Sequence, residues 1–327
     1  MYLPPVRNNF TVKTVITDSA EEAAEFIRRG GIVAFPTETV YGLGADIFNE
    51  EALAKIFEAK RRPADNPLIV HIADRGQIRP LATSLSDDAR MLIEKFFPGP
   101  LTVVVEKSPA VPRLATAGLD SVGIRMPRGR LTGEFLAACG TPVAAPSANI
   151  SGRPSPTTWK AVREDLDGRI DCILQGDSTE IGLESTVVDC TGNIPALLRP
   201  GAISIDLLRA VVPGIGVAVG GEGDVVHSPG MRHQHYSPKA RVRLVDAGER
   251  VDVESKAAYI GIYDVGEGFE LKRLCGSAEE YAREVFEFFR ECDRAEIETI
   301  YCEVVQEDGI GVALMDRLRR ASEKVKK

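Results

Sequence analysis

Short apolar runs alternate with amphipathic stretches along most of this chain. The apolar runs predict strands at 32–35, 68–72, 101–105, 122–125, 143–145, 170–174, 186–189 and 196–198. The amphipathic stretches predict helices at about 20–29, 50–60, 87–97, 132–139 and 158–166. Helices and strands in this order pack best when the helices cover a sheet. The pattern therefore predicts an α/β protein built on a mixed sheet.

The alternation stops in a glycine-rich stretch at 214–239 and then resumes. Glycine-rich sequence holds regular structure poorly, so this stretch indicates a linker. Beyond it, strands are predicted at 242–245, 257–262 and 299–304, with a helix capped by Ser277 and a terminal helix that ends in basic residues. A chain of 327 residues fits two domains. We divide it into a larger domain at 1–213, a linker at 214–239 and a small, doubly wound, Rossmann-like α/β domain at 240–327.

Charge and composition exclude several classes of protein. The net charge of −8 argues against a protein whose whole surface coats nucleic acid, so any phosphate site must be local. No apolar run is long enough to span a bilayer, and no basic segment followed by an apolar stretch opens the chain, which favours a cytoplasmic location. The six cysteines have no CxxC spacing. We expect them to be small buried hydrophobes rather than a disulfide framework or a metal site.

A polar segment follows directly after the strand at 32–35. It contains Thr37, Glu38, Thr39 and Tyr41, with glycines close behind. Ligands of open α/β sheets commonly bind beyond the ends of strands, and glycine permits close approach of the backbone. An ordinary turn whose hydroxyls cap backbone groups would have the same composition.

Basic residues surround a proline-rich turn at 60–68. The flanking prolines stiffen this turn, and Asn66 can hold it with side-chain hydrogen bonds, which would fix Lys60 and Arg62 as a phosphate clamp. The alternative is a solvated basic end of a helix. The chain contains no GxxxxGK[ST] loop and no GxGxxG following a strand, which removes the main support for kinase-like and Rossmann nucleotide sites.

Further polar residues lie at the end, just past the end or at the opening of other predicted strands. They are His71, Arg125, Ser147 with Asn149, Ser185, and Arg199. A lone histidine is often structural, and Ser-Ala-Asn is also a common turn. An arginine in such a place can grip an anion with its two-pronged fork. The four cations Lys60, Arg62, Arg125 and Arg199 make ATP the obvious candidate ligand for an otherwise acidic protein.

These segments together resemble the YrdC-like threonylcarbamoyl-AMP synthase family. The resemblance is carried by the segment 35–43, by Lys60-x-Arg62 with Asn66-Pro67-Leu68, and by Ser147-Ala148-Asn149, all in the family's order. Arg-x-Pro at 125–127 and Glu-Ser-Thr at 184–186 support it. The match covers about 15–210, and the segment 233–238 with the remaining tail is similar to the family's longer, two-domain form.

The resemblance implies a twisted open sheet whose concave face binds the substrates ATP, L-threonine and bicarbonate. The implied product is threonylcarbamoyl-AMP with pyrophosphate, and magnesium is expected on the triphosphate. The resemblance places the catalytic cations at Lys60 and Arg62. The implied ATP site comprises Lys60, Arg62, Asn66, Ser121, Ser147, Asn149, Ser155, Arg199, His235 and Tyr236. The implied threonine site comprises Thr39, His71, Arg125, Ala145 and Ser185.

The resemblance also implies a place in tRNA modification. The product would pass to a tRNA threonylcarbamoyl transferase complex, with a weak direct contact to tRNA left open. His235 and Tyr236 would act in a lid over the site, with glycine hinges at 220–223, against the alternative of a plain spacer. Two other functions compete: RNA binding without catalysis, and carbamoyl transfer to another acceptor. RNA binding alone would give no reason to combine Thr39, His71, Arg125 and Ser185 with a lid. The sequence also lacks the zinc-binding and acylphosphatase-like segments expected of larger carbamoylating enzymes.

Overall fold

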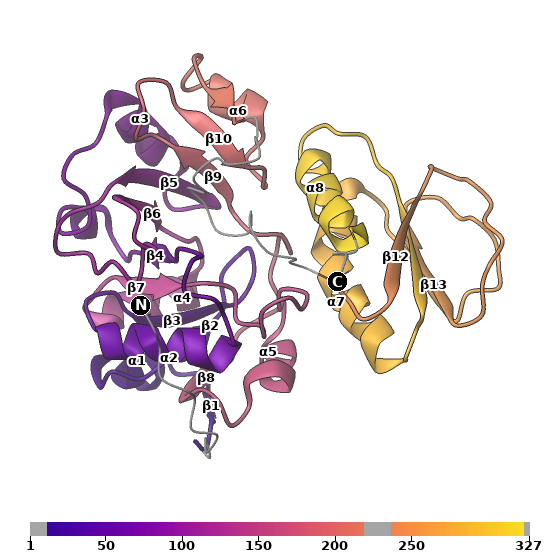
Figure 1. Cartoon of the computed structure of the whole chain (residues 1–327), viewed down its shortest axis with the longest axis horizontal. Helices are drawn as coiled ribbons and strands as arrows, with labels where there is room; N and C mark the ends of the chain where they lie inside the picture. Colours follow the sequence, from indigo (N-terminus) through magenta and orange to yellow (C-terminus); the bar gives the residue numbers. More distant parts are fainter. Residues whose placement is uncertain (1–11, 219–236, 324–327) are drawn as a thin grey trace.

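The computed structural model describes residues 12–218 and 237–323, which form two lobes joined side by side (Figure 1). Within these residues the larger lobe holds a sheet of 11 strands in the order β1-β8-β2-β3-β7-β4-β6-β5-β9-β10-β11. The strands are β1 (Val15–Thr17), β2 (Val33–Phe35), β3 (Gly42–Asp46), β4 (Ile69–His71), β5 (Leu101–Glu106), β6 (Ser121–Arg125), β7 (Val143–Ala145), β8 (Cys172–Leu174), β9 (Thr186–Asp189), β10 (Ala196–Arg199) and β11 (Gly216–Val217). Parallel and antiparallel neighbours both occur, which confirms the predicted mixed sheet.

Helices cover both faces of this sheet. They are α1 (Ala20–Arg28), α2 (Glu50–Lys60), α3 (Asp87–Phe96), α4 (Arg130–Cys139), α5 (Trp159–Leu166) and α6 (Ile205–Arg209), with a 3₁₀ turn η1 (Arg75–Ile78). The apolar sides of α2, α3 and α5 pack into one core on one face. Helices α1 and α4 pack into a separate core on the other face. The two faces therefore bury different sets of alternating strand residues.

The smaller lobe is a parallel sheet with two helices. Its strands β12 (Arg241–Val245), β13 (Ala257–Gly261), β14 (Leu271–Leu274) and β15 (Thr299–Glu303) run in the order β12-β15-β13-β14. Helix α7 (Ala278–Arg294) begins at Ser277, whose side chain accepts a hydrogen bond from the Glu280 amide as predicted. Helices α7 and α8 (Gly311–Ser322) lie on the side of this sheet that faces the larger lobe (Figure 1). Both described helices of this lobe therefore cover one face of the sheet, so the expected doubly wound arrangement is wrong.

Strands β1, β3, β11 and β14 and helix α6 were not predicted from the sequence pattern. Strand β3 contains Gly42 and Gly44, which made it resemble a turn. Both glycines face close neighbours, since a Cβ at Gly44 would lie 2.4 Å from Cγ1 of Val143. Strand β11 extends the large sheet into the first residues of the predicted linker. The domain boundaries themselves stay a prediction.

All six cysteines are buried and free, which confirms the expected small-hydrophobe role. Burial raises the pKa of the Cys139, Cys172 and Cys190 thiols to about 12. Among the described residues, no helix combines the length and the apolar character needed to cross a bilayer.

Candidate functional site

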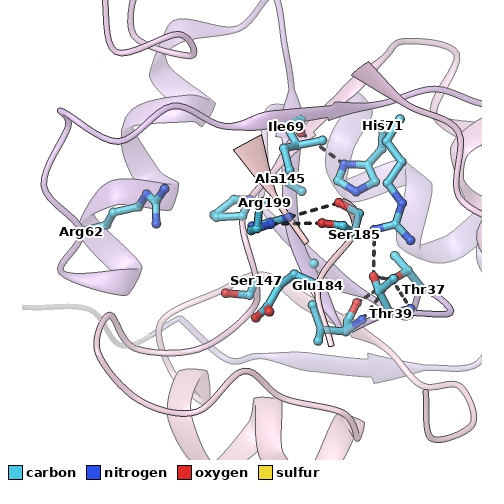
Figure 2. A pocket seen from close by; sticks show the side chains of 14 residues that line it. Thr37, Thr39, Arg62, Ile69, His71, Ala145, Ser147, Glu184, Ser185 and Arg199 are labelled. Atoms are coloured by element: carbon cyan, nitrogen blue, oxygen red, sulfur yellow. Dashed lines mark hydrogen bonds between the residues drawn. The ribbon is translucent and has the colours of Figure 1, made fainter. Parts of the chain in front are cut away.

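A polar cleft opens on one face of the large sheet, over β4, β6 and β7 and beside the end of β10. It encloses about 590 Å³ of empty space, a volume that includes solvent at its open mouth. It is lined by Thr37, Thr39, Val40, Gly42, Arg62, Ile69, His71, Arg125, Ala145, Pro146, Ser147, Glu184, Ser185 and Arg199 (Figure 2). In the contributing strands, Val70 and Ile124 point into the core beneath α2 and α3. Their neighbours His71 and Arg125 consequently point to the opposite face, into the cleft.

The connection between β2 and β3 forms one wall of the cleft. Because β2 and β3 are antiparallel neighbours, this connection returns the chain directly from one strand to the next. The Thr37 hydroxyl donates to the Val40 carbonyl over 2.7 Å and lies 2.8 Å from the Thr39 hydroxyl. Internal bonds thus order the loop while both threonines still line the cleft.

Arg125 is held in a fixed orientation by this loop. Its guanidinium donates to the Glu38 carboxylate over 2.6 Å and to the Thr39 hydroxyl over 2.8 Å. Glu38 also accepts from the backbone amide of Arg128, and Glu38 and Arg125 are both buried. The buried ion pair leaves the guanidinium preorganised at the wall of the cleft, where it can meet an anionic group without reorganising.

His71 sits beside Arg125 in register across β4 and β6. Its Nδ1 lies 3.2 Å from the carbonyl oxygen of Ile69. Phe35 packs edge-on against the ring. Burial, reinforced by the charge of Arg125, lowers the pKa of His71 to about 3. The imidazole is therefore neutral at physiological pH, and one of its two ring nitrogens can accept a hydrogen bond.

Acid should destabilise the protein through His71. The folded state keeps this imidazole neutral, whereas the unfolded chain binds a proton below about pH 6.5, so stability is lost as pH falls from 6.5 towards 3. We expect this group to contribute a slope of about 1.4 kcal/mol per pH unit across that window. Denaturant unfolding of wild type and His71→Gln from pH 7.5 to 4 should show a shallower decline in the variant. Parallel declines would contradict the assignment.

Ser185 and Arg199 form the opposite wall. Arg199 Nε donates to the Ser185 carbonyl over 3.0 Å, and a terminal nitrogen lies 3.1 Å from the Ser185 hydroxyl. The same hydroxyl lies 2.8 Å from that of Thr102 on β5. Hydrogen bonds to Arg199 and Thr102 therefore fix the Ser185 side chain. Figure 2 shows Ser185 between His71 and Arg199.

Lys60 lies behind the cleft wall rather than in the cleft lining. Its ammonium donates to the carbonyl oxygens of Ser147 and Asn149, and the side chain is buried. Burial and the neighbouring charge of Arg62 lower the pKa of Lys60 well below its ordinary value. In this arrangement Lys60 orders the loop at 147–149, in which the Ser147 hydroxyl bonds the Asn149 side chain over 2.5 Å.

Arg62 reaches the cleft from the turn after α2. One guanidinium nitrogen donates to the carbonyls of Asn66 and Pro67, both over 3.2 Å. Arg62 is thus bonded to the backbone of the turn, whereas Oδ1 of Asn66, whose side chain was expected to hold the turn, has no hydrogen-bond partner among the described residues. Figure 2 shows Arg62 at one end, apart from the group around His71 and Ser185.

The cleft brings together many of the residues that the sequence singled out. The predicted residues that line it are Thr39, Arg62, His71, Arg125, Ala145, Ser147, Ser185 and Arg199. The predicted residues outside this lining are Lys60, Asn66, Asn149 and Ser155, which are buried, and Ser121, which lines a small neighbouring cavity. His235 and Tyr236 lie outside the described residues.

Some cleft residues were missed by sequence reasoning. Glu184 lines the cleft, and its carboxylate accepts from the Ser155 hydroxyl over 2.5 Å. Thr102 supports Ser185 from within a strand whose other buried residues are all apolar. Only the position of Glu184 next to Ser185 offered a signal.

Two family models together match nearly the whole chain. The model described as "Telomere recombination" matches residues 25–201. The model described as "Threonylcarbamoyl-AMP synthase, C-terminal domain" matches residues 203–323. The first covers the large sheet with its cleft, and the second covers the smaller lobe.

Relatives of known name match over almost the same length. A threonylcarbamoyl-AMP synthase of Pyrococcus abyssi is 46% identical over 319 residues, which span 92% of this chain and 93% of the relative. The Bacillus subtilis enzyme of the same name is 40% identical, covering 92% of each chain. The crystal structure of P. abyssi Sua5 complexed with L-threonine is 43% identical, covers 95% of this chain and 97% of that one, and superposes with a TM-score of 0.87.

The chain is a two-lobed α/β protein with a cationic, hydroxyl-lined cleft, and the names of its relatives identify it as an enzyme of the nucleotidyltransferase type. Given the matches to both lobes, the chain belongs to the threonylcarbamoyl-AMP synthase family.

Proposed function

We propose that this protein joins L-threonine, bicarbonate and ATP into threonylcarbamoyl-AMP and releases pyrophosphate. The observation that carries the proposal is the convergence of two buried guanidiniums in one cleft. Arg125 is held at Thr39, and Arg199 is held at Ser185. Two separately anchored cations suit a reaction that joins two anionic substrates. The names of the relatives and the threonine complex of the P. abyssi structure support the same substrates.

The threonine site is assigned to the walls built by β2–β3, β4 and β6. Arg125 would bind the carboxylate or the nascent carbamate, because its fork is already ordered by Glu38. Thr39 and Ser185 would bind the polar groups of the amino acid, and His71 would accept a hydrogen bond at one ring nitrogen. Ala145 would leave space for the side-chain methyl group.

The ATP site is assigned to the part of the cleft around Arg62, Ser147 and Arg199. Arg62 and Arg199 would face the phosphates, with ATP supplied as its magnesium complex. Lys60 and Asn149 would act through the loop they order, and Lys60 would reach a phosphate only by exchanging its carbonyl partners. Asn66, Ser121, Ser155, His235 and Tyr236 complete the assigned set.

The proposed chemistry needs no covalent intermediate with the protein. The neutral threonine amine attacks the carbon of bicarbonate, a C–N bond forms, a C–O bond breaks, and water is lost. If bicarbonate first dehydrates to CO₂, water leaves in that earlier step, and the amine releases a proton to solvent as the carbamate forms. A carbamate oxygen then attacks the α-phosphorus of ATP, and the bond to the β-phosphate oxygen breaks to release pyrophosphate. Ordered cations lower the barrier by stabilising charge on the α-phosphate and on the leaving group.

The product would serve the threonylcarbamoyl modification of tRNA. A mixed carbamic–phosphoric anhydride is labile in water, so a tRNA threonylcarbamoyl transferase complex in the cytoplasm would have to consume it promptly.

The function is tested by following pyrophosphate release from ATP with labelled bicarbonate and each amino acid in turn. Wild type should give a threonine-dependent signal and a product that carries the label. The signal should collapse in Arg62→Ala and in Ser147→Ala. Equal turnover with serine, with valine and without any amino acid would defeat the assignment.

A further inference from the structure

One side chain of the smaller lobe reaches the wall of the cleft. Arg317 on α8 is fully buried, with 1% of its surface exposed. Its Nε donates to the Glu184 carboxylate over 2.9 Å, and a terminal nitrogen donates to the Pro200 carbonyl over 3.1 Å. Arg317 therefore connects α8 with two separate segments of the larger lobe.

Those two segments are the ones that carry Ser185 and Arg199. Glu184 immediately precedes Ser185, and Pro200 immediately follows Arg199. Ser185 and Arg199 are themselves joined by two hydrogen bonds of 3.0 and 3.1 Å. The Arg317 guanidinium thus binds the residue before Ser185 and the residue after Arg199. Ser185 and Arg199 together form one wall of the cleft.

Arg317 is the main positive charge that stabilises the ionised carboxylate of Glu184. Burial opposes its ionisation, but the charges of Arg317 and Arg199 and hydrogen bonds from Ser155 and Arg317 lower its pKa from the ordinary value. Without Arg317 the buried carboxylate would lose its main counter-charge.

The segment before Glu184 is also seated against the smaller lobe. Gly182 has φ of +82°, and a Cβ there would lie 2.4 Å from Cα of Arg283 on α7. Leu183 and Val40 pack in the same apolar cluster as residues of α7 and α8. The amides of Ile181 and Gly182 donate to the carbonyls of Glu38 and Thr39. Helix α7 therefore backs the loop that orders Arg125.

We propose that the smaller lobe completes the active site from behind, with Arg317 as a positioning residue that holds Ser185 and Arg199 at their working separation. The proposal rests on the proposed function of the cleft. It assigns residues 240–323 a role in catalysis although none of them lines the cleft.

The test compares Arg317→Met and Arg317→Lys with a matched control, Arg294→Met. Arg294 on α7 also bridges the lobes, since it pairs with Glu164 over 3.1 Å. That pair is half-exposed, and neither residue lines the cleft. Lysine at 317 keeps the positive charge but has one donor group in place of the two-pronged fork. For each protein, kcat, KM for threonine, KM for ATP and the unfolding temperature are measured.

We expect Arg317→Met to lower kcat/KM for threonine and for ATP by about tenfold or more, and Arg317→Lys to lose less while melting close to wild type. Arg294→Met should stay within about twofold of wild type. Folded Arg317→Met with wild-type kcat and KM values would overturn the proposal, as would equal losses in Arg317→Met and Arg294→Met. If Arg317→Met is unfolded, Arg317→Lys decides: wild-type constants overturn the proposal, and a loss of about threefold or more supports it.

If the proposed function is wrong, wild type will show no threonine-dependent pyrophosphate release. In that case calorimetric titration of wild type, Arg317→Met and Arg317→Lys with magnesium-ATP alone still tests the positioning role of Arg317. Weaker ATP binding in the two Arg317 variants than in Arg294→Met supports it, and equal binding overturns it.

Discussion

Replacing Arg125 with methionine should reduce threonine-dependent pyrophosphate release by about 10²- to 10³-fold in kcat/KM for threonine. Arg125 is the cation that the cleft holds most firmly, through Glu38 at 2.6 Å and Thr39 at 2.8 Å. Methionine has a similar length but neither the charge nor the donors. The substrate anion would lose its counter-charge, and KM for threonine should rise more than KM for ATP.

The matching control is Arg128→Met. Arg128 is exposed and pairs with Glu180 over 2.9 Å, while its backbone amide still donates to Glu38. Truncating Arg125 also leaves Glu38 as a buried carboxylate without its partner, so unfolding must be followed alongside kinetics. The double variant Glu38→Gln/Arg125→Met removes both charges and should recover stability without recovering activity. Activity restored by the double variant would show that Arg125 serves folding alone.

Much of the larger lobe could be predicted from the sequence because its helices and strands have distinct periodicities. Strands such as β5 and β7 are buried on both faces and appear as continuous apolar runs. The exceptions have physical reasons. β3 is rich in glycine because Phe35 and Val143 pack closely over Gly44. β14 is a half-exposed edge strand with two basic residues in four, so it lacks a strong apolar signal.

The cleft was largely predictable because its residues follow recognisable strands. Arg125 and His71 end neighbouring strands, and parallel pairing brings them side by side. The sequence did not indicate which groups the charged side chains would hydrogen-bond to. Lys60 lies among backbone carbonyls because the loop at 147–149 folds over the end of α2, and no pattern of side chains records that contact. The pairing of Arg317 with Glu184 spans 133 residues and was equally hidden.

Replacing Arg199 with methionine should have the complementary effect, a loss of about 10²- to 10³-fold in kcat/KM for ATP. Its guanidinium is buried beside Ser185, on the wall of the cleft opposite the Glu38–Arg125 pair. Removing it should weaken magnesium-ATP binding in calorimetric titrations performed without threonine. KM for threonine should rise less, because Ser185 loses one of its two partners but keeps Thr102 at 2.8 Å.

Arg209→Met provides the control for this experiment. Arg209 on α6 donates to the Ile215 carbonyl over 3.3 Å and does not line the cleft, so its variant should retain wild-type ATP binding. The variants of the two cleft arginines are expected to affect different substrates. If Arg125→Met mainly raises KM for threonine while Arg199→Met mainly weakens ATP binding, the cleft has two anion sites with separate cations. Identical kinetic changes in the two variants would mean that both arginines serve one substrate, and the division of the cleft proposed here would be wrong.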